Sequence, residues 1–302
     1  MVRMDIWSLK YFLAVARAGN LTHASATLHI SQPALSMRLA ELERELGHPL
    51  FVRGPRGMTL TEKGALLMRR AEDLVGLADR IESEIRADDV KGLSGTIAIG
   101  AGETVAFAPV ADAIKSLCAE NPDLRIDITS GNGEDIQTRI QSGTVDLALF
   151  VGPGRYKGYD HIAFPHVIRW GLLMRRDAPL ASHRSIHAKD LDGIPILLTR
   201  QMMVGEFLSG WLGRACGSLN VVCTYNLAYN AAIMVASGLG AAICIDSVIP
   251  AAFADSIVFR PFTPALTSDA YLAWRKDVPL SPAATALVER VRVLAEVHDN
   301  SL

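Results

Sequence analysis

Three polar side chains with nucleic-acid-binding chemistry lie close together in the first fifth of the chain: Gln32, Ser36 and Arg38. A glutamine amide can hydrogen-bond the edge of adenine, an arginine guanidinium can bind guanine or a phosphate, and a serine hydroxyl can bind a base or a phosphate. The same stretch carries leucines at helical spacing, which are Leu35, Leu39, Leu42 and Leu46. Burying that stripe leaves Gln32 and Ser36 on one flank and Arg38 on the other, so this helix is expected to contact double-stranded DNA.

The elements before this helix predict a helix-turn-helix. A first helix is expected over residues 8–17, a second is capped by Thr22, and Ser31 caps the third after a tight turn. Pro33 falls in the first turn of the third helix, where its missing N–H costs little. Thr22 and Ser31 would cap helices in any protein, so a purely structural role for both remains open beside contact with DNA.

Two short extended segments follow, residues 49–53 and 57–60, around a Gly-Pro-Arg-Gly turn. This pattern predicts a hairpin of the type called a wing, from which Arg53 and Arg56 reach flanking phosphates or the minor groove. The candidate DNA-binding residues are therefore Thr22, Ser31, Gln32, Pro33, Ser36, Met37, Arg38, Arg53 and Arg56.

A long helix is expected from Glu62 to about Asp88, capped by Thr61. Its apolar residues recur at spacings of 4-3-4-3-4, the pattern of a coiled-coil seam, and charged residues crowd its other faces. The seam consists of Leu67, Ala71, Leu74, Ala78, Ile81 and Ile85. The pattern favours pairing with a second copy of the chain, and the alternative is an amphipathic helix packed on its own domain.

Beyond an expected hinge at residues 89–95, strands alternate with helices. Strands are expected over 96–100, 124–130, 145–151, 170–175, 194–199, 221–225, 241–245 and 270–275, and helices over 104–119, 134–142, about 203–214, 228–237 and 281–297. Such alternation predicts parallel, doubly wound sheets, here in two lobes that are connected twice and enclose a cleft.

Open sheets of this kind bind ligands at the carboxyl ends of their strands, so residues there are candidate effector contacts. They are Gly102, Glu103, Thr104, Gly131, Asn132, Thr199, Arg200 and Asn226. For three of them a purely structural role remains open. Glu103 could stabilise a helix dipole, Thr104 could only cap its helix, and Arg200 could form a surface or interlobe salt bridge.

Several other functions are not expected. The four cysteines are dispersed and the N-terminus lacks the layout of a signal peptide, which indicates a cytoplasmic protein with reduced, mostly buried thiols. The uncharged stretch from Ala215 to Ile245 contains asparagines and glycines and favours a buried α/β segment over a membrane span. No nucleophile elbow, P-loop or dinucleotide fingerprint is present, and His183 and His187 are interpreted as a surface pair, so no catalytic residue, metal or cofactor is expected.

The N-terminal sequence closely resembles the LysR-type signature. The matching segments are Phe12–Val15, Leu21–Ser25, Leu28–Ser36, Leu42-Glu43, Leu46-Gly47, Pro49–Phe51 and Leu60–Gly64. Residues 95–297 resemble the effector domain of the same family, which is similar to periplasmic substrate-binding proteins. The cues there are Ile97–Gly100, Asn121-Pro122, Asp146–Ala148, Pro179-Leu180, Gly238–Gly240 and Pro279–Ser281.

The resemblance implies a multidomain fold: an all-α winged helix-turn-helix with a long linker helix, followed by a two-lobed, doubly wound α/β domain. The implied domains are 1–61 for DNA binding, 62–88 for dimerisation, 89–95 as hinge and 96–302 for the effector, with lobe I at about 96–155 and 265–302 and lobe II at about 156–264.

The resemblance also implies a transcriptional regulator whose partners are a double-stranded DNA operator, a small-molecule effector, a second or further copies of the chain (homodimer or homotetramer) and RNA polymerase. Two positions depart from the family pattern. Met37 stands where relatives often carry a polar or basic base-reading side chain, and Gly102 where they often carry a hydroxyl that contacts a ligand carboxylate. The main alternative is a two-lobed solute-binding protein without a transcriptional role, for which a helix-turn-helix would have no use.

Overall fold

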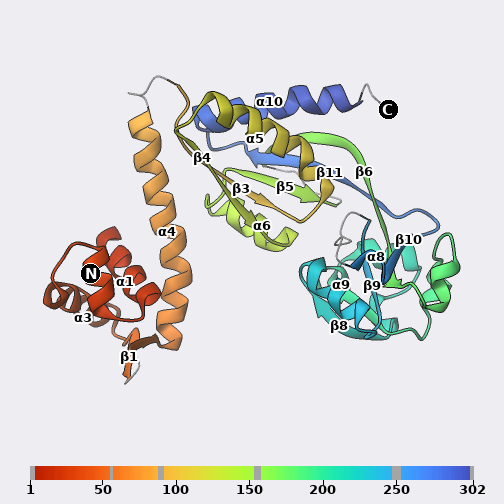
Figure 1. The fold of residues 1–302 in the computed structure, drawn as a ribbon, viewed down its shortest axis with the longest axis horizontal. Helices are drawn as coiled ribbons and strands as arrows, with labels where there is room; N and C mark the ends of the chain where they lie inside the picture. Colours follow the sequence, from red (N-terminus) through yellow and green to blue (C-terminus); the bar gives the residue numbers. More distant parts are fainter. Residues whose placement is uncertain (1–3, 55–56, 88–91, 153–157, 247–252, 300–302) are drawn as a thin grey trace. The chain divides into compact units, whose positions relative to one another are not determined.

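The computed structural model describes residues 4–54, 57–87, 92–152, 158–246 and 253–299. They divide into two compact units, Met1–Asp89 and Val90–Leu302, each of which is described by itself (Figure 1). The first unit is helical with one small hairpin, and the second is built around a mixed sheet.

Three short helices, a hairpin and one long helix make up the first unit. They are α1 (Ile6–Ala18), α2 (Leu21–Thr27), α3 (Gln32–Leu46), β1 (Phe51–Gly54), β2 (Gly57–Leu60) and α4 (Glu62–Ala87). The predicted helix-turn-helix and wing are therefore confirmed. A left-handed Gly19 ends α1 and a left-handed Gly47 ends α3, as expected for residues that carry no Cβ.

The cap of α2 corrects the sequence prediction. Asn20, not Thr22, is the N-cap, and its side-chain oxygen accepts a hydrogen bond of 2.6 Å from the His23 N–H. Thr22 lies two residues further on, as the second residue of the helix. The prediction for Ser31 is confirmed, because its hydroxyl accepts from the Ala34 N–H at the start of α3.

The leucine stripe of α3 supplies much of the first unit's core. Leu35, Leu39 and Leu42 are almost fully buried against α1, while Leu46 is half-buried. The carboxylate of Glu43 accepts hydrogen bonds from the N–H groups of Leu50 (2.6 Å) and Phe51 (3.2 Å), so α3 also anchors the first strand of the wing.

The predicted seam of α4 is wrong in its first half. Ala71 is completely buried in the core of its own unit, and Leu67 packs against that core, so neither faces outward. Ala78 is half-buried, and the side chain of Ile85 lies outside the described part of the chain. Leu74 and Ile81 are exposed, at 44% and 47%, and the apolar stripe open to solvent is completed by Leu66 at 46%.

Ion pairs hold the buried face of α4 on α1. Lys10 Nζ lies 2.6 Å from the carboxylate of Asp79, and Arg17 lies 3.2 Å from that of Glu72. One face of α4 therefore packs on its own unit, as the amphipathic alternative expected. The exposed apolar residues lie on a different face of the helix. Apolar residues on the core-facing side and on the solvent-facing side of α4 both recur about every seven residues. The sequence spacing therefore cannot tell which of the two sides pairs with another helix.

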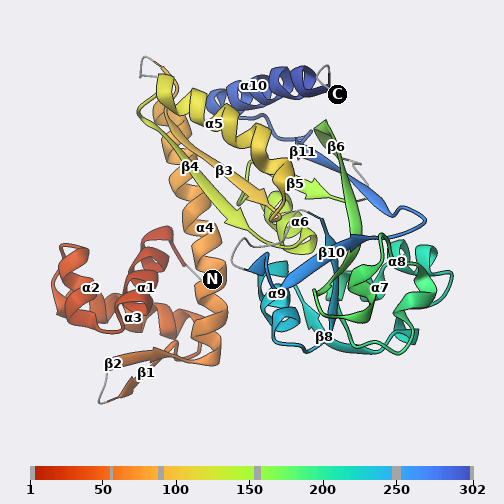
Figure 2. The ribbon, with the colours of Figure 1, turned by 45° about the vertical axis from the view of Figure 1, so that its right-hand side comes forward.

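The second unit contains two sheets that share one strand (Figure 2). The strands are β3 (Gly95–Ala101), β4 (Leu124–Ser130), β5 (Leu147–Val151), β6 (Tyr159–Arg175), β7 (Ile196–Thr199), β8 (Val221–Tyr225), β9 (Ala241–Ile245), β10 (Ile257–Pro261) and β11 (Thr267–Arg275). The strand order is β4-β3-β5-β11-β6-β9-β7-β8, with β10 also on β6. Pairs among β3, β4 and β5 and among β7, β8 and β9 are parallel, as predicted, whereas β6, β10 and β11 pair antiparallel with their neighbours.

Strand β6 is longer than the sequence pattern indicated. It has 17 residues, of which those up to Arg169 pair with β11 in the first sheet and those from Trp170 pair with β9 in the second. The chain therefore passes between the lobes within β6 and returns between β10 and β11. Only the part from Trp170 onward is continuously apolar, and β10 was not predicted at all.

Helices cover both faces of each sheet. They are α5 (Ala108–Glu120), α6 (Gly133–Gln141), α7 (Arg200–Val204), α8 (Glu206–Leu212), α9 (Ala228–Ala236) and α10 (Pro282–Asp299), with short 3-10 turns η1 (Val105–Phe107), η2 (Pro179–Ser182), η3 (Ala188–Leu191) and η4 (Cys216–Ser218). In the first lobe α5 and α10 share one face and α6 packs on the other; in the second lobe α8 and α9 lie on opposite faces. No helix among the described residues is long and apolar enough to cross a membrane.

Two glycines on α4 provide a matched test of the first unit's packing. A Cβ at Gly64 would lie 2.1 Å from the Leu50 carbonyl oxygen, whereas one at Gly76 would meet nothing within 4 Å. Gly64→Ala is therefore expected to destabilise the protein by about 2–4 kcal/mol, because backbone must move. Gly76→Ala should stabilise it by about 0.5–1 kcal/mol, the gain in helix propensity. Urea unfolding of the full chain, followed by circular dichroism, measures both, and equal effects would contradict the close approach of α4 to the wing.

Candidate functional site

The predicted DNA-contact residues of α3 lie on its solvent side. Gln32, Pro33 and Arg38 are exposed, Met37 is 64% exposed, and Ser36 is half-buried. Because the leucines hold the opposite face in the core, α3 can enter a groove without losing its packing.

Arg38 is restrained by a neighbour on its own helix. Its guanidinium lies 3.4 Å from one carboxylate oxygen of Glu41, and the other oxygen lies 3.7 Å from Arg44. The pair is exposed and therefore weak, so a phosphate can replace Glu41 at small cost.

The remaining predicted DNA contacts are divided between caps and the wing. Thr22 and Ser31 are exposed, with Ser31 engaged as a cap. Arg53 lies in β1, but its side chain is outside the described part of the chain, as is all of Arg56. An apolar wing residue that the sequence analysis did not single out, Val52, is 55% exposed beside Arg53.

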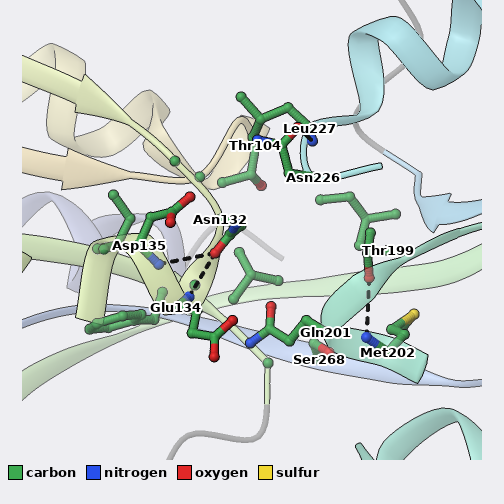
Figure 3. A pocket seen from close by; sticks show the side chains of 18 of the residues that line it. Thr104, Asn132, Glu134, Asp135, Thr199, Gln201, Met202, Asn226, Leu227 and Ser268 are labelled. Atoms are coloured by element: carbon green, nitrogen blue, oxygen red, sulfur yellow. Dashed lines mark hydrogen bonds between the residues drawn. The ribbon is translucent and has the colours of Figure 1, made fainter. Parts of the chain in front are cut away.

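A cavity of about 1370 Å³ lies within the second unit, between its two lobes. All the predicted effector contacts line it: Gly102, Glu103, Thr104, Gly131, Asn132, Thr199, Arg200 and Asn226. They meet there because the carboxyl ends of β3, β4, β7 and β8 point to this space from both lobes, as the topology rule requires (Figure 3).

Four of these side chains hold the local backbone as well as facing the cavity. Asn132 Oδ1 accepts from the N–H groups of Glu134 (2.9 Å) and Asp135 (3.0 Å), which caps α6 (Figure 3). Thr199 and Thr104 accept from backbone N–H groups in the same way, and Asn226 Oδ1 accepts from the Leu227 N–H. The two bonds to Asn132 use both lone pairs of its Oδ1, whereas the oxygens of Thr104, Thr199 and Asn226 accept one bond each and keep a second acceptor position beside their donors.

Gly102 leaves space at the cavity wall. A Cβ added there would lie 3.8 Å from the Gly131 carbonyl oxygen, an ordinary contact distance. The missing hydroxyl at this position is therefore not imposed by crowding.

The sequence analysis did not single out Trp170, Phe207, Tyr271 or Ser268, which also line the cavity. Trp170 and Phe207 pack edge to face with ring centres 5.8 Å apart, and Phe150 and Tyr271 form a second pair, also at 5.8 Å. Ser268, only 5% exposed, accepts a 2.7 Å hydrogen bond from the Trp170 indole N–H. Trp170 and Ser268 are 98 positions apart, so no local pattern could bring them together.

Charge in the cavity is predominantly negative. Besides Glu103, carboxylates come from Glu134, Asp135 and Glu206, and the only lining cation among the described residues is Arg200. The three additional acids were also missed. The sequence did contain a pattern that could have identified them, because each lies in the first turn of a helix, α6 or α8.

The buried wall of the cavity is chemically inert. Complete burial raises the pKa of the Cys244 thiol to about 12, and burial likewise raises the pKa of the Tyr225 hydroxyl, which donates to the Ile243 carbonyl. A thiol protonated at neutral pH is no nucleophile. Among the described residues no group of three or more His, Cys, Asp or Glu side chains is placed to hold a metal ion.

These features define a class of protein: a helix-turn-helix regulator joined to a two-lobed ligand-binding domain. Family comparison agrees over nearly the whole chain. Residues 6–65 match the model described as a bacterial regulatory helix-turn-helix protein of the lysR family, and residues 91–295 match the LysR substrate binding domain.

Curated relatives match the chain over nearly its full length. The chain is 28% identical to YvbU of Bacillus subtilis, an uncharacterized HTH-type transcriptional regulator, over 96% of this chain and 99% of the relative. It is 27% identical to HcaR of Escherichia coli, the Hca operon transcriptional activator, over 90% and 92%. Among solved structures, CbnR, a LysR family transcriptional regulator, shares the fold with a TM-score of 0.69 at 21% identity, covering 97% and 99%.

The chain belongs to the lysR family and is a LysR-type transcriptional regulator with a substrate-binding domain. The match over residues 6–65 removes the alternative of a solute-binding protein without a transcriptional role. The relatives are named as regulators and not as enzymes, in agreement with the interpretation of the sequence.

The thiol chemistry can be tested directly. At pH 8 the raised pKa keeps Cys244 protonated and its burial blocks access, so iodoacetamide is expected to leave it unmodified in the native protein. Because the folded pKa exceeds the ordinary value of 9.0, the stability that this thiol contributes is present below pH 9 and is lost as the pH rises toward 12. Peptide mass spectrometry measures the alkylation, with urea-unfolded protein as the control in which all four thiols react. Rapid native modification of Cys244 would contradict the assignment.

Proposed function

We propose that this regulator binds operator DNA sequence-specifically through α3 and the wing, as a dimer, and that a small molecule in the interlobe cavity modulates its activity. The single observation that carries the DNA proposal is the two-sided character of α3: a leucine face locked in the core and an exposed face with Gln32 and Arg38.

Residues of α3 divide between base reading and phosphate contact. Gln32 is the first residue of α3, where its amide can address adenine. Pro33 has no N–H and the Ala34 N–H donates to the Ser31 hydroxyl, so the Gln32 N–H is the first-turn donor left for a phosphate. Met37 offers an apolar surface to a thymine methyl. Full-length CbnR in complex with its target DNA shares the fold at a TM-score of 0.69. This likeness supports the proposal that the fold binds DNA.

Dimerisation is assigned to the exposed stripe of α4. Leu66, Leu74 and Ile81 lie within one quadrant of the helix and are the large apolar side chains that its solvent side shows among the described residues. A second copy would cover them, and two-fold symmetry would place two copies of α3 on two half-sites of the operator. The expectation of a homotetramer and of contact with RNA polymerase rests on the family resemblance.

Effector control is assigned to the relative angle of the lobes. Only β6 and the link between β10 and β11 join them, and Gly133 of one lobe approaches Gln201 of the other so closely that a Cβ at Gly133 would lie 3.2 Å from the Gln201 amide nitrogen. A ligand that contacts both lobes favours the closed arrangement, and so changes the geometry that the domain imposes on the dimer.

Removing the Gln32 amide tests the DNA proposal. Gln32→Ala is expected to weaken binding to a selected operator fragment by about 1–3 kcal/mol while sparing non-specific binding, because only base-edge hydrogen bonds are lost. Gel-shift titrations against specific and scrambled duplexes measure the difference. Gln141→Ala, an exposed glutamine of α6 away from the cavity, is the matched control. Unchanged sequence preference in Gln32→Ala would exclude the base-reading role.

Charges on the exposed stripe test the dimer. Introducing Leu74→Glu and Ile81→Glu together should convert the dimer to a monomer, since like charges would face each other across a dry seam. Light scattering after size exclusion gives the mass. Arg69→Glu, on an exposed part of α4 outside the stripe, should remain dimeric. A double variant that keeps the native mass would place the interface elsewhere.

A further inference from the structure

The described residues that line the cavity include more acids than bases. Four carboxylates line it, those of Glu103, Glu134, Asp135 and Glu206, against the one guanidinium of Arg200, so the described lining has three net negative charges. The acids come from both lobes, so their potentials add in the space between.

These carboxylates are not used by the protein itself. Among the described residues none of the four forms an ion pair or accepts a hydrogen bond through its side chain. Elsewhere in the second unit acids are paired, for example Glu120 with Arg290 at 2.7 Å and Asp277 with Arg275 at 2.6 Å. The described lining of the cavity therefore concentrates carboxylates that form no ion pair with another described residue.

The helix end that could offset this charge is already neutralised. Asn132 Oδ1 accepts from the first N–H groups of α6, and Glu134 and Asp135 in its first turn oppose the positive end of the helix dipole. An anionic ligand would thus find α6 occupied and would be repelled by the acids beside it.

Aromatic side chains that line the same cavity also favour a cation. Trp170 and Phe207 form an edge-to-face pair from the second lobe, and Phe150 and Tyr271 form a tilted pair from the first. The negative face of an aromatic ring attracts a cation, and ammonium groups with alkyl substituents are the usual ligands of aromatic-walled sites. This attraction is independent of the carboxylates.

One buried donor indicates that the ligand also has a polar acceptor. An indole N–H can only donate, so Ser268 Oγ is the acceptor of the Trp170 bond, and the described residues offer its own O–H no acceptor. With Ser268 95% buried at the cavity wall, that hydrogen is available to a bound molecule.

Resting on the proposal that this cavity is the effector site, we propose that the effector is an organic cation: a protonated amine or quaternary ammonium with an apolar body and a hydrogen-bond acceptor. The ammonium lies among the carboxylates and aromatic faces, and the acceptor binds Ser268 or Arg200. A neutral sugar would also stack on aromatic rings and bind acids, but it would leave the three net negative charges without compensation.

Matched compounds that differ only in charge test the class of ligand. One series is choline, 3,3-dimethylbutan-1-ol and 3,3-dimethylbutanoate; the other is tyramine, tyrosol and 4-hydroxyphenylacetate, with glucose added as a sugar. Each is added to the full-length protein at about 10 mM and constant ionic strength, so that even a millimolar Kd raises the melting temperature. The cation of each series is expected to give the largest shift, with a calorimetric Kd about fivefold or more below that of its neutral counterpart.

Single substitutions separate the two sources of attraction. Glu134→Gln and Glu103→Gln should each weaken cation binding by about two- to fivefold and leave the neutral counterpart unchanged, as expected for exposed charges. Phe207→Leu, which keeps an apolar side chain but removes the ring face, should also reduce the preference for the cation. Glu289→Gln, an exposed acid of α10 outside the cavity, is the control and should change nothing.

The outcomes are distinguishable. Preferential binding of anions, of glucose or of neutral compounds, or equal binding of all three charges, overturns the cation assignment and leaves the cavity as an effector site. If no compound of any charge shifts the melting temperature while the same preparation still binds operator DNA, both the cation assignment and effector control through this cavity are overturned.

Discussion

A single strand, β6, belongs to both sheets of the second unit, and the ligand cavity depends on that sharing. Its first half pairs with β11 and its second half with β9 and β10, so the two lobes are joined by continuous hydrogen-bonded backbone. Because β6 passes along the floor between the lobes, it carries Trp170 to the place where Ser268 of β11 can accept its N–H. A change in the angle between the lobes, as the proposed effector control requires, would act through this shared strand.

In the first unit, α3 has to satisfy packing and recognition with different faces of 15 residues. Its leucines face α1, its Glu43 carboxylate binds the backbone of the wing, and only the remaining side is left for DNA. The position of the wing relative to α3 is consequently set by a half-buried carboxylate as well as by the hairpin itself. In the proposed mode of DNA binding, this carboxylate couples α3 to the wing.

In the proposed effector site, side chains that cap helix N-termini influence which charge of ligand the two-lobed fold favours. Helix N-termini at strand ends attract anions when their N–H groups are free. Here Asn132 and Thr199 take up those groups from within the chain, and first-turn acids cancel the remaining positive charge at α6. What the fold presents to a ligand is then decided by side chains: carboxylates, aromatic faces and hydroxyl donors.

Local patterns in the sequence predicted the helices of the first unit, the wing, the parallel strands and eight of the residues that line the cavity, because periodicity, caps and topology are properties of neighbouring residues. Competition between local candidates was settled by geometry: Asn20 rather than Thr22 caps α2, since it stands directly before the first turn. Tertiary structure alone decided which side of α4 is open, because Ala71 is buried by α1 and the wing and not by anything in its own heptad. It alone also joined Trp170 to Ser268 across 98 positions, since the hydrophobic pattern of a strand specifies its face but not which distant strand lies beside it.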